Sequence, residues 1–259
     1  MDYQQLPFKI PRESSDYPEC SRFVVAQIEA ILREALESGR NRIVINTNLR
    51  RGLPMENINK VAGPFVEAWV FEVFQNLSED PNNVFQLVHV EAKERLYMAD
   101  IILQFKRRRK TESGITAEVD VKATAEDFKD SGKSPNISSF KRIRTAYIED
   151  PDYIFIVLSV KHRVYSARNV DSGLMDGIME VVSYNAYDLK YLSSADISFN
   201  PALGTGQLQI RDIHYVTLEV RTTWEFCQLL DGKYLKSSKR TLEDWIALAS
   251  KNRWIKTDD

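Results

Sequence analysis

The chain has 259 residues, of which 43% are hydrophobic and 28% are charged, and its formal net charge is −2. This composition is typical of a globular protein that buries a core, and it excludes a disordered or low-complexity chain. No apolar run is long enough to span a membrane, no secretory signal is visible, and the two cysteines, too few for a disulfide framework, are expected to be reduced thiols in a cytoplasm.

The N-terminal part of the chain is predicted to be mainly helical. Apolar residues recur at three- and four-residue steps from Phe23 to Ala35, which predicts a helix that ends at Gly39. A short strand is predicted at 42–46. Residues 57–76 are predicted to form one helix or two. The preferred helix runs from Pro64 to Leu77, because proline is tolerated at the first position of a helix.

The middle of the chain changes to a period of two, which is typical of strands. Apolar and polar residues alternate in 100–106 and again in 115–124. The basic segment between them contains Gly114 and is predicted to connect the two strands as a hairpin. Further predictions are an extended segment at 84–90, a helix at 138–147 and a fully buried strand at 153–160.

The C-terminal part is predicted to contain both strands and helices. Its predicted elements are strands near 207–213 and 215–220, a helix from about 221, and a helix at 242–249. Because helices and strands are interleaved along the whole chain, the predicted fold class is α/β (α+β). Because the chain has no repeats and no obvious linker, we expect one domain over 1–259.

The triplet Asp120-Val121-Lys122 is the strongest candidate for a chemical site. Strand spacing puts Asp120 and Lys122 on one face, while Val121 lies on the other. A hairpin would bring Asp100 of the preceding strand opposite Asp120. A surface ion pair without function explains the spacing equally well, and similar triplets occur at 91–93, 127–129, 188–190 and 231–233.

Two carboxylates and a lysine on neighbouring strands suit the hydrolysis of a phosphodiester. The anionic diester repels hydroxide, and a divalent cation relieves that repulsion and lowers the pKa of water. Mg²⁺ usually takes one or two protein carboxylates, and Asp100 and Asp120 are expected to supply them. Lys122 is expected beside the attacking water or the phosphate. Glu118, on the same face, is expected to help hold a second metal or its waters, and Glu67, on the predicted helix, is another candidate acid.

Basic and polar segments near this strand are candidate contacts to nucleic acid. The runs 106–110 and 141–144 offer local positive charge despite the negative net charge, although a solvated turn is the simpler interpretation of the first run. The loop 130–136 contains Asn136, which can pair with adenine, and Lys133, which can pair with guanine. The simpler interpretation of Asn136 is a cap on the next helix.

Ala99-Asp100 followed by Glu118-Val-Asp120-Val-Lys122 resembles the PD-(D/E)xK nuclease signature, with Ala99 in place of a proline that has no catalytic role there. Residues 98–105 (MADIILQF), 117–124 (AEVDVKAT) and 131–140 (SGKSPNISSF) resemble type II restriction endonucleases that leave blunt ends. The similarity extends from 45–64 to 221–231 and covers most of the chain.

The resemblance implies a restriction-endonuclease-like core with a mixed central sheet flanked by helices. The catalytic core would occupy about 60–165, and the part that contacts DNA and supports a dimer about 166–259. Asp100 and Asp120 would bind Mg²⁺, Lys122 would position the nucleophilic water, and Glu67 would be the acid on the preceding helix. The residues implied to contact DNA are Lys133, Ser134, Asn136, Gln207 and Gln209.

The resemblance also implies the biological setting of the protein. Such enzymes act in the bacterial cytoplasm as twofold homodimers on palindromic double-stranded DNA. Each works beside a cognate DNA methyltransferase with which it forms no stable complex. The implied recognition sequence is GTTAAC, cut at its centre.

Two other interpretations stay open. A structure-selective repair or junction-resolving nuclease would share the acids and the lysine but would prefer branched DNA. A noncatalytic DNA-binding module would use the basic runs and the Asn136 loop, and its behaviour would not depend on Asp120. A restriction enzyme, by contrast, produces discrete bands from plasmid DNA.

Overall fold

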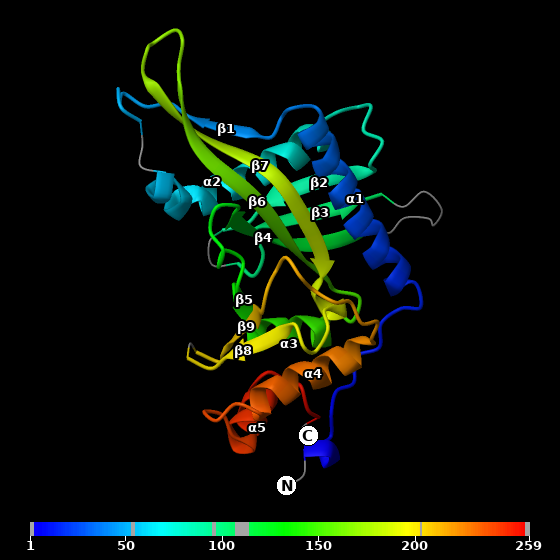
Figure 1. Cartoon of the computed structure of the whole chain (residues 1–259). Coiled ribbons are helices and arrows are strands. Elements are labelled where there is room, and N and C mark those ends of the chain that lie inside the picture. Colours follow the sequence, from blue (N-terminus) through cyan, green and yellow to red (C-terminus); the bar gives the residue numbers. More distant parts are fainter. Residues whose placement is uncertain (1–2, 53–54, 95–96, 107–113, 203, 257–259) are drawn as a thin grey trace. The chain divides into compact units, whose positions relative to one another are not determined.

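A six-stranded mixed sheet forms the centre of the larger of two compact units (Figure 1). The structure, a computed structural model, describes residues 3–52, 55–94, 97–106, 114–202 and 204–256. The larger unit contains 20–132 and 155–187, and the smaller contains 1–19, 133–154 and 188–259. From edge to edge the larger sheet runs β1 (Arg42–Ile45), β7 (Met175–Asp188), β6 (Ile154–Arg168), β4 (Ile115–Ala125), β3 (Ile101–Phe105) and β2 (Leu87–Ala92).

The strands β2, β3 and β4 form an antiparallel group that carries the candidate acids. At the other edge, β1 pairs antiparallel with β7. The strands β6 and β7 form a long hairpin that extends beyond the rest of the sheet (Figure 1). The predicted α/β (α+β) class, with a mixed sheet and flanking helices, is confirmed.

Helix α1 (Tyr17–Glu37) buries the apolar face that its sequence period predicts. Ile28, Ile31 and Leu32 are fully buried. Each such side chain contributes roughly 1.5–3 kcal/mol when it leaves water. The Phe23 ring meets the Phe105 ring of β3 edge-on, with 5.9 Å between their centroids. These contacts fix α1 against the sheet.

Helix α2 (Met55–Ser78) packs on β2 and β4 and contains Pro64. The predicted start of this helix at Pro64 is therefore wrong, since the helix already begins at Met55. Pro64 cannot donate to the carbonyl of Lys60, which costs about 3 kcal/mol in a helix interior. Burial of Val66, Val70 and further apolar residues against the sheet offsets that cost, so tertiary packing decides where the helix begins.

The predicted strands of the larger unit are confirmed with small shifts of their ends. The extended segment predicted at 84–90 becomes a strand only from Leu87, and the strand predicted at 153–160 continues to Arg168. The strand β7 was not predicted, because its sequence mixes polar and apolar residues without a clear period.

The smaller unit combines a three-stranded sheet with helices. The strand order is β5 (Asn136–Ser139), β9 (Gln207–Ile210) and β8 (Ile197–Asn200). The other elements are α3 (Phe140–Glu149), α4 (Thr223–Leu235), α5 (Leu242–Lys251) and the 3-10 turns η1 (Tyr3–Gln5) and η2 (Leu189–Tyr191). Thr222 and Thr241 begin α4 and α5 with capping boxes. None of the described helices has the length and apolar character needed to cross a bilayer.

The strand predicted at 215–220 is wrong. Its backbone makes one isolated bridge, between Leu192 and Leu218, and the apolar side chains Tyr215 and Val220 are exposed. Alternation alone does not produce a strand without a neighbouring edge to pair with, and here no described strand runs beside the segment. The strand predicted at 207–213 ends at Ile210.

A buried ion pair between Arg144 and Asp231 joins α3 to α4. The guanidinium Nε lies 3.1 Å from Asp231 Oδ1, and both side chains are completely buried. Asp231 also accepts hydrogen bonds from the Tyr3 hydroxyl at 2.6 Å and from Trp245 Nε1 at 3.0 Å. Asp231 is therefore the acceptor that η1, α3 and α5 share.

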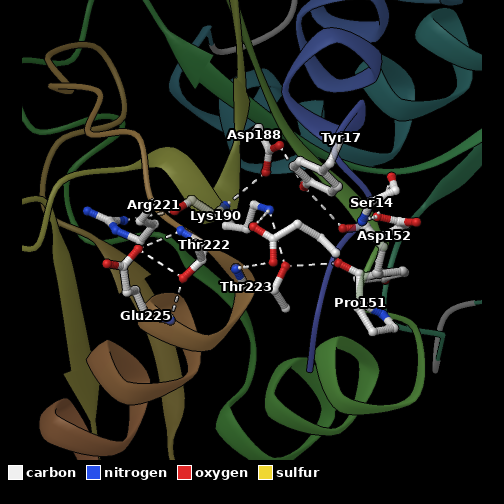
Figure 2. Close-up of polar contacts among 12 residues, drawn as sticks. Ser14, Tyr17, Pro151, Asp152, Asp188, Lys190, Arg221, Thr222, Thr223 and Glu225 are labelled. Atoms are coloured by element: carbon white, nitrogen blue, oxygen red, sulfur yellow. Dashed lines mark hydrogen bonds and ion pairs between the residues drawn. The ribbon is translucent and has the colours of Figure 1, made fainter. Parts of the chain in front are cut away.

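A second buried cation, Lys190, lies where several segments of the smaller unit meet (Figure 2). Its ammonium is 3.2 Å from Thr223 Oγ1, 3.6 Å from Glu13 Oε1 and 3.1 Å from the centroid of the Tyr17 ring. The Tyr17 hydroxyl donates to Asp188 at 2.8 Å, and Asp188 caps η2. Burial lowers the pKa of Lys190, and the Glu13 charge opposes that change.

Gly206 is predicted to be irreplaceable at the start of β9. Its φ is +93°, and a Cβ atom there would lie 2.1 Å from Phe199 Cζ of β8. We expect Gly206→Ala to lower the free energy of unfolding by about 1–3 kcal/mol, because it combines overpacking with a strained backbone. Urea unfolding measures the change.

Gly232, in the last turn of α4, is the matched control for that substitution. A Cβ atom there meets nothing within 4 Å. Gly232→Ala should raise the free energy of unfolding by about 0.5–1 kcal/mol, because alanine favours a helix over glycine. Equal effects of the two substitutions would contradict the geometry described for Gly206.

Candidate active site

The hairpin of β3 and β4 brings Asp100 and Asp120 together, as the spacing predicted. Ile101 pairs with Val119, so each acid lies one residue from this pair. The Asp100 amide donates to the Val119 carbonyl at 3.0 Å, and Asp100 Oδ2 accepts from the Val121 amide at 2.7 Å. The Asp100 carboxylate is thus held against the backbone of the strand that carries Asp120.

Asp120 is a buried carboxylate with one oxygen bonded and one not. Its residue is 4% exposed, and Oδ1 accepts from Lys122 Nζ at 2.8 Å. Oδ2 is also buried and accepts no hydrogen bond from any residue that the structure describes. A buried polar atom without a partner is costly, so this oxygen is a candidate ligand for a cation. The ion pair that the spacing allowed is present, but its carboxylate is buried instead of lying at the surface.

Burial raises the pKa of Asp120 to about 7. The Lys122 ammonium opposes the rise, whereas the charges of Asp100 and Glu67 add to it. A positive ion placed beside these acids would reverse the balance and favour the ionised carboxylate.

This elevated pKa predicts a stability that falls as pH rises. Aspartate in the unfolded chain titrates near 3.8, so between about pH 4 and pH 7 the folded state holds the extra proton. For each unit by which the folded pKa exceeds the unfolded pKa, the folded state loses about 1.4 kcal/mol of stability once the pH is above both values. Metal-free wild type should therefore lose more stability than Asp120→Asn between pH 5 and pH 8, as assayed by urea unfolding in EDTA. Parallel losses in the two proteins would contradict the assignment.

Glu67 of α2 lies between two cavities that flank the acids. One cavity, of about 510 Å³, is also lined by Lys122, and the other, of about 810 Å³, is also lined by Asp100. Burial raises the pKa of Glu67, the Asp100 charge adds to the rise, and Lys122 opposes it. Helix α2 thus brings the predicted third acid to the two strands.

The donors of this site fit Mg²⁺. Among the described residues, no group of three or more histidine, cysteine, aspartate or glutamate side chains is close enough to hold an ion. Mg²⁺ does not require such a group, because it keeps several waters and usually takes one or two carboxylates. The buried Asp120 Oδ2 and the Asp100 carboxylate are hard oxygen atoms of the kind that this ion prefers.

Glu118 has a partner outside this group. Its Oε1 accepts from the Tyr97 hydroxyl at 2.8 Å, and Glu118 itself is buried. A role for Glu118 in holding a second metal stays a prediction.

The predicted DNA-contacting residues lie on β5, on β9 and in the segment just before β5, all in the smaller unit. Asn136 pairs with Gln209 across β5 and β9, and Gln209 Nε2 donates to Asn136 Oδ1 at 3.0 Å and to the Ser134 carbonyl at 3.1 Å. The backbone of Lys133 forms an isolated antiparallel β-bridge with that of Asp212. Gln207 lies two residues along β9, opposite Ser139. Asn136, Gln209 and the Ser134 carbonyl form a polar cluster, and Gln207 and Gln209 lie on the face of β9 opposite to the buried Leu208 and Ile210.

Two expectations about these segments change. Asn136 does not cap α3, because Ser139 occupies the N-cap and accepts from the Arg142 amide at 3.3 Å. Arg144, from the second basic run, is buried against Asp231 and offers no surface charge. Residues 107–110 of the first run lie outside the described part of the chain.

The sequence did not reveal two residues of the Lys122 cavity, Asn59 and His162. His162 follows the apolar run of β6. A polar residue next to such a run was the signal in the sequence that could have identified it. Asn59 lies on the part of α2 that precedes Pro64, outside the preferred predicted helix.

Comparisons with known proteins identify the family of the chain. The family model for type II restriction endonuclease HpaI matches residues 4–253. The type II restriction enzyme HpaI of Haemophilus parainfluenzae is 57% identical over 256 residues, which are 99% of this chain and 100% of that protein. Among solved structures, the NlaIV restriction endonuclease matches with a TM-score of 0.46 and 13% identity, over 86% of this chain and 87% of that one. The chain therefore belongs to the HpaI family of type II restriction endonucleases.

Proposed function

We propose that the protein hydrolyses phosphodiester bonds of double-stranded DNA at a short palindromic site, with Mg²⁺ held by Asp100 and Asp120. The observation that carries this proposal is the buried, unpartnered Asp120 Oδ2 among the described residues. The other oxygen of the Asp120 carboxylate accepts a hydrogen bond from Lys122. Asp100 lies on the neighbouring strand of the same hairpin. Family membership supports the reaction class.

Each residue of the site has a distinct task in this reaction. When bound, Mg²⁺ supplies positive charge that lowers the pKa of nearby water and stabilises charge on the phosphate. Asp100 and Asp120 hold the ion, and the Val121 amide keeps the Asp100 carboxylate in one orientation. Lys122, bonded to Asp120, presents its ammonium to the attacking water or the phosphate. Glu67 would accept a proton or hold water beside them.

Sequence specificity is assigned to the polar cluster of the smaller unit. We propose that Asn136, Lys133 and Ser134 read base edges, with Gln207 and Gln209 beside them. An exposed amide such as Asn136 can pair bidentately with adenine, and its bond from Gln209 orients that amide. The proposed recognition sequence is GTTAAC, cut at its centre to leave blunt ends.

A palindromic site favours a twofold homodimer, because each protomer then meets the same half-site. We propose that the enzyme works as such a dimer in the bacterial cytoplasm, and that a cognate DNA methyltransferase protects the host's own sites without binding the enzyme stably.

Digestion of a sequenced plasmid tests the proposal. With Mg²⁺ the protein should produce discrete fragments whose mapped ends all fall at the centre of GTTAAC, and with EDTA it should produce none. Preferential cutting of branched DNA would favour a junction-resolving nuclease instead. Binding without any cleavage would favour a noncatalytic DNA-binding module.

A further inference from the structure

The cavity beside Lys122 contains polar residues that the proposed reaction leaves without a task. It has a volume of about 510 Å³ and lies entirely within the larger unit. Besides Lys122 and Glu67, its lining includes Asn59, Lys60, Asp130 and His162. The cavity therefore extends from the candidate catalytic lysine to the N-terminal half of α2.

His162 is fixed in the wall of this cavity. It is 2% exposed and belongs to β6, where its carbonyl accepts from the Glu126 amide at 2.8 Å. Its Nε2 lies 3.2 Å from Asn59 Oδ1. Its Nδ1 is buried and has no hydrogen-bond partner among the residues described. A buried imidazole with one nitrogen unsatisfied is a costly choice for a central strand, where an apolar side chain would pack without that cost.

The contact with His162 determines what Asn59 presents. Burial lowers the pKa of His162, and the charge of Asp127 opposes that change, so the imidazole is neutral near pH 7 and carries one ring proton. Because an amide oxygen can only accept, Nε2 holds that proton and donates it to Asn59 Oδ1. The other polar atom of the Asn59 amide is Nδ2, which can only donate hydrogen bonds. Asn59 itself lines the cavity.

We propose that Asn59 donates a hydrogen bond to the DNA backbone phosphate next to the one that is cleaved, and that His162 is the positioning residue that orients its amide. This inference rests on the proposed nuclease function. Phosphate suits the site because it only accepts hydrogen bonds, and because the Lys60 and Lys122 charges offset those of Glu67 and Asp130 in the cavity lining.

Binding to modified duplexes tests the contact directly. The duplex carries one copy of the site mapped by plasmid digestion, and a series of duplexes replaces single phosphates near the cut with uncharged methylphosphonate. Affinities are measured in EDTA. Asn59→Ala should weaken binding of the unmodified duplex by about ten- to a hundredfold. Wild type should lose a similar factor at one phosphate adjacent to the cut, and Asn59→Ala should lose nothing further there.

Variants of His162 separate positioning from packing. His162→Gln can keep a donor toward Asn59 and should bind within about twofold of wild type, whereas His162→Leu should behave like Asn59→Ala. Should His162→Leu fail to fold, the methylphosphonate series on Asn59→Ala still decides the question. Wild-type affinity in Asn59→Ala, or an undiminished methylphosphonate effect in that variant, overturns the inference. Wild type that does not cut DNA in Mg²⁺ overturns the proposed function instead.

Discussion

Asp120→Asn is expected to lower the rate of DNA cleavage by about a thousandfold or more while leaving DNA binding largely intact. The substitution keeps the shape of the side chain and an oxygen for Lys122, but it removes the charge that would hold the cation. Charge stabilisation by a catalytic metal is worth several kcal/mol, and each 1.4 kcal/mol changes the rate by about tenfold. Binding should not fall, because the variant removes a negative charge that repels phosphate.

Single-turnover cleavage in Mg²⁺ and duplex binding in EDTA provide the two measurements for Asp120→Asn. The matched control is Glu91→Gln, because Glu91-Ala92-Lys93 has the same spacing and contains an exposed ion pair of 2.5 Å on β2. Glu91→Gln should cleave at the wild-type rate. Mg²⁺-dependent cleavage retained by Asp120→Asn would contradict the site assignment.

Asp231→Ala is expected to destabilise the smaller unit by about 3–5 kcal/mol, because it leaves the Arg144 guanidinium buried and unpaired. Loss of the Asp231 carboxylate would also leave Trp245 Nε1 and the Tyr3 hydroxyl without their acceptor. Guanidine unfolding followed by tryptophan fluorescence would measure this change, since Trp245 contacts Asp231 directly.

Two further variants make this stability prediction specific. Glu243→Ala, an exposed acid in the first turn of α5, should change the free energy of unfolding by less than about 1 kcal/mol. Tyr3→Phe removes one of the hydrogen bonds to Asp231 and should cost about 1 kcal/mol. If Asp231→Ala cost no more than Tyr3→Phe, the buried ion pair would not have the importance given to it here.

The strands of the candidate site were predictable because their period and register are local properties. Alternation in β3 and β4 identified which residues share a face, and a hairpin then places Asp100 and Asp120 at nearly opposite positions. The burial of Asp120 was not predictable, since it depends on α2 packing over β4. The triplet at 188–190 illustrates the limit, because Asp188 and Lys190 belong to a buried structural network that sequence spacing alone does not distinguish from the candidate triplet at 120–122.

Long-range contacts account for the features that sequence reasoning missed. Lys190 is held by Glu13 and Thr223, which are distant from it along the chain and carry no shared pattern. The contact between Asn59 and His162 joins α2 to β6 and has no local signal either. The segment 215–220 has the alternation of a strand but makes only a single bridge, because pairing depends on a neighbouring edge.

Anomalous diffraction from crystals of the enzyme with bound duplex and Mn²⁺ in place of Mg²⁺ tests the central claim most directly. The metal signal should lie within about 2–2.5 Å of Asp120 Oδ2 and of an Asp100 oxygen. A fully occupied ion held elsewhere, with both carboxylates turned away from it, would contradict the account.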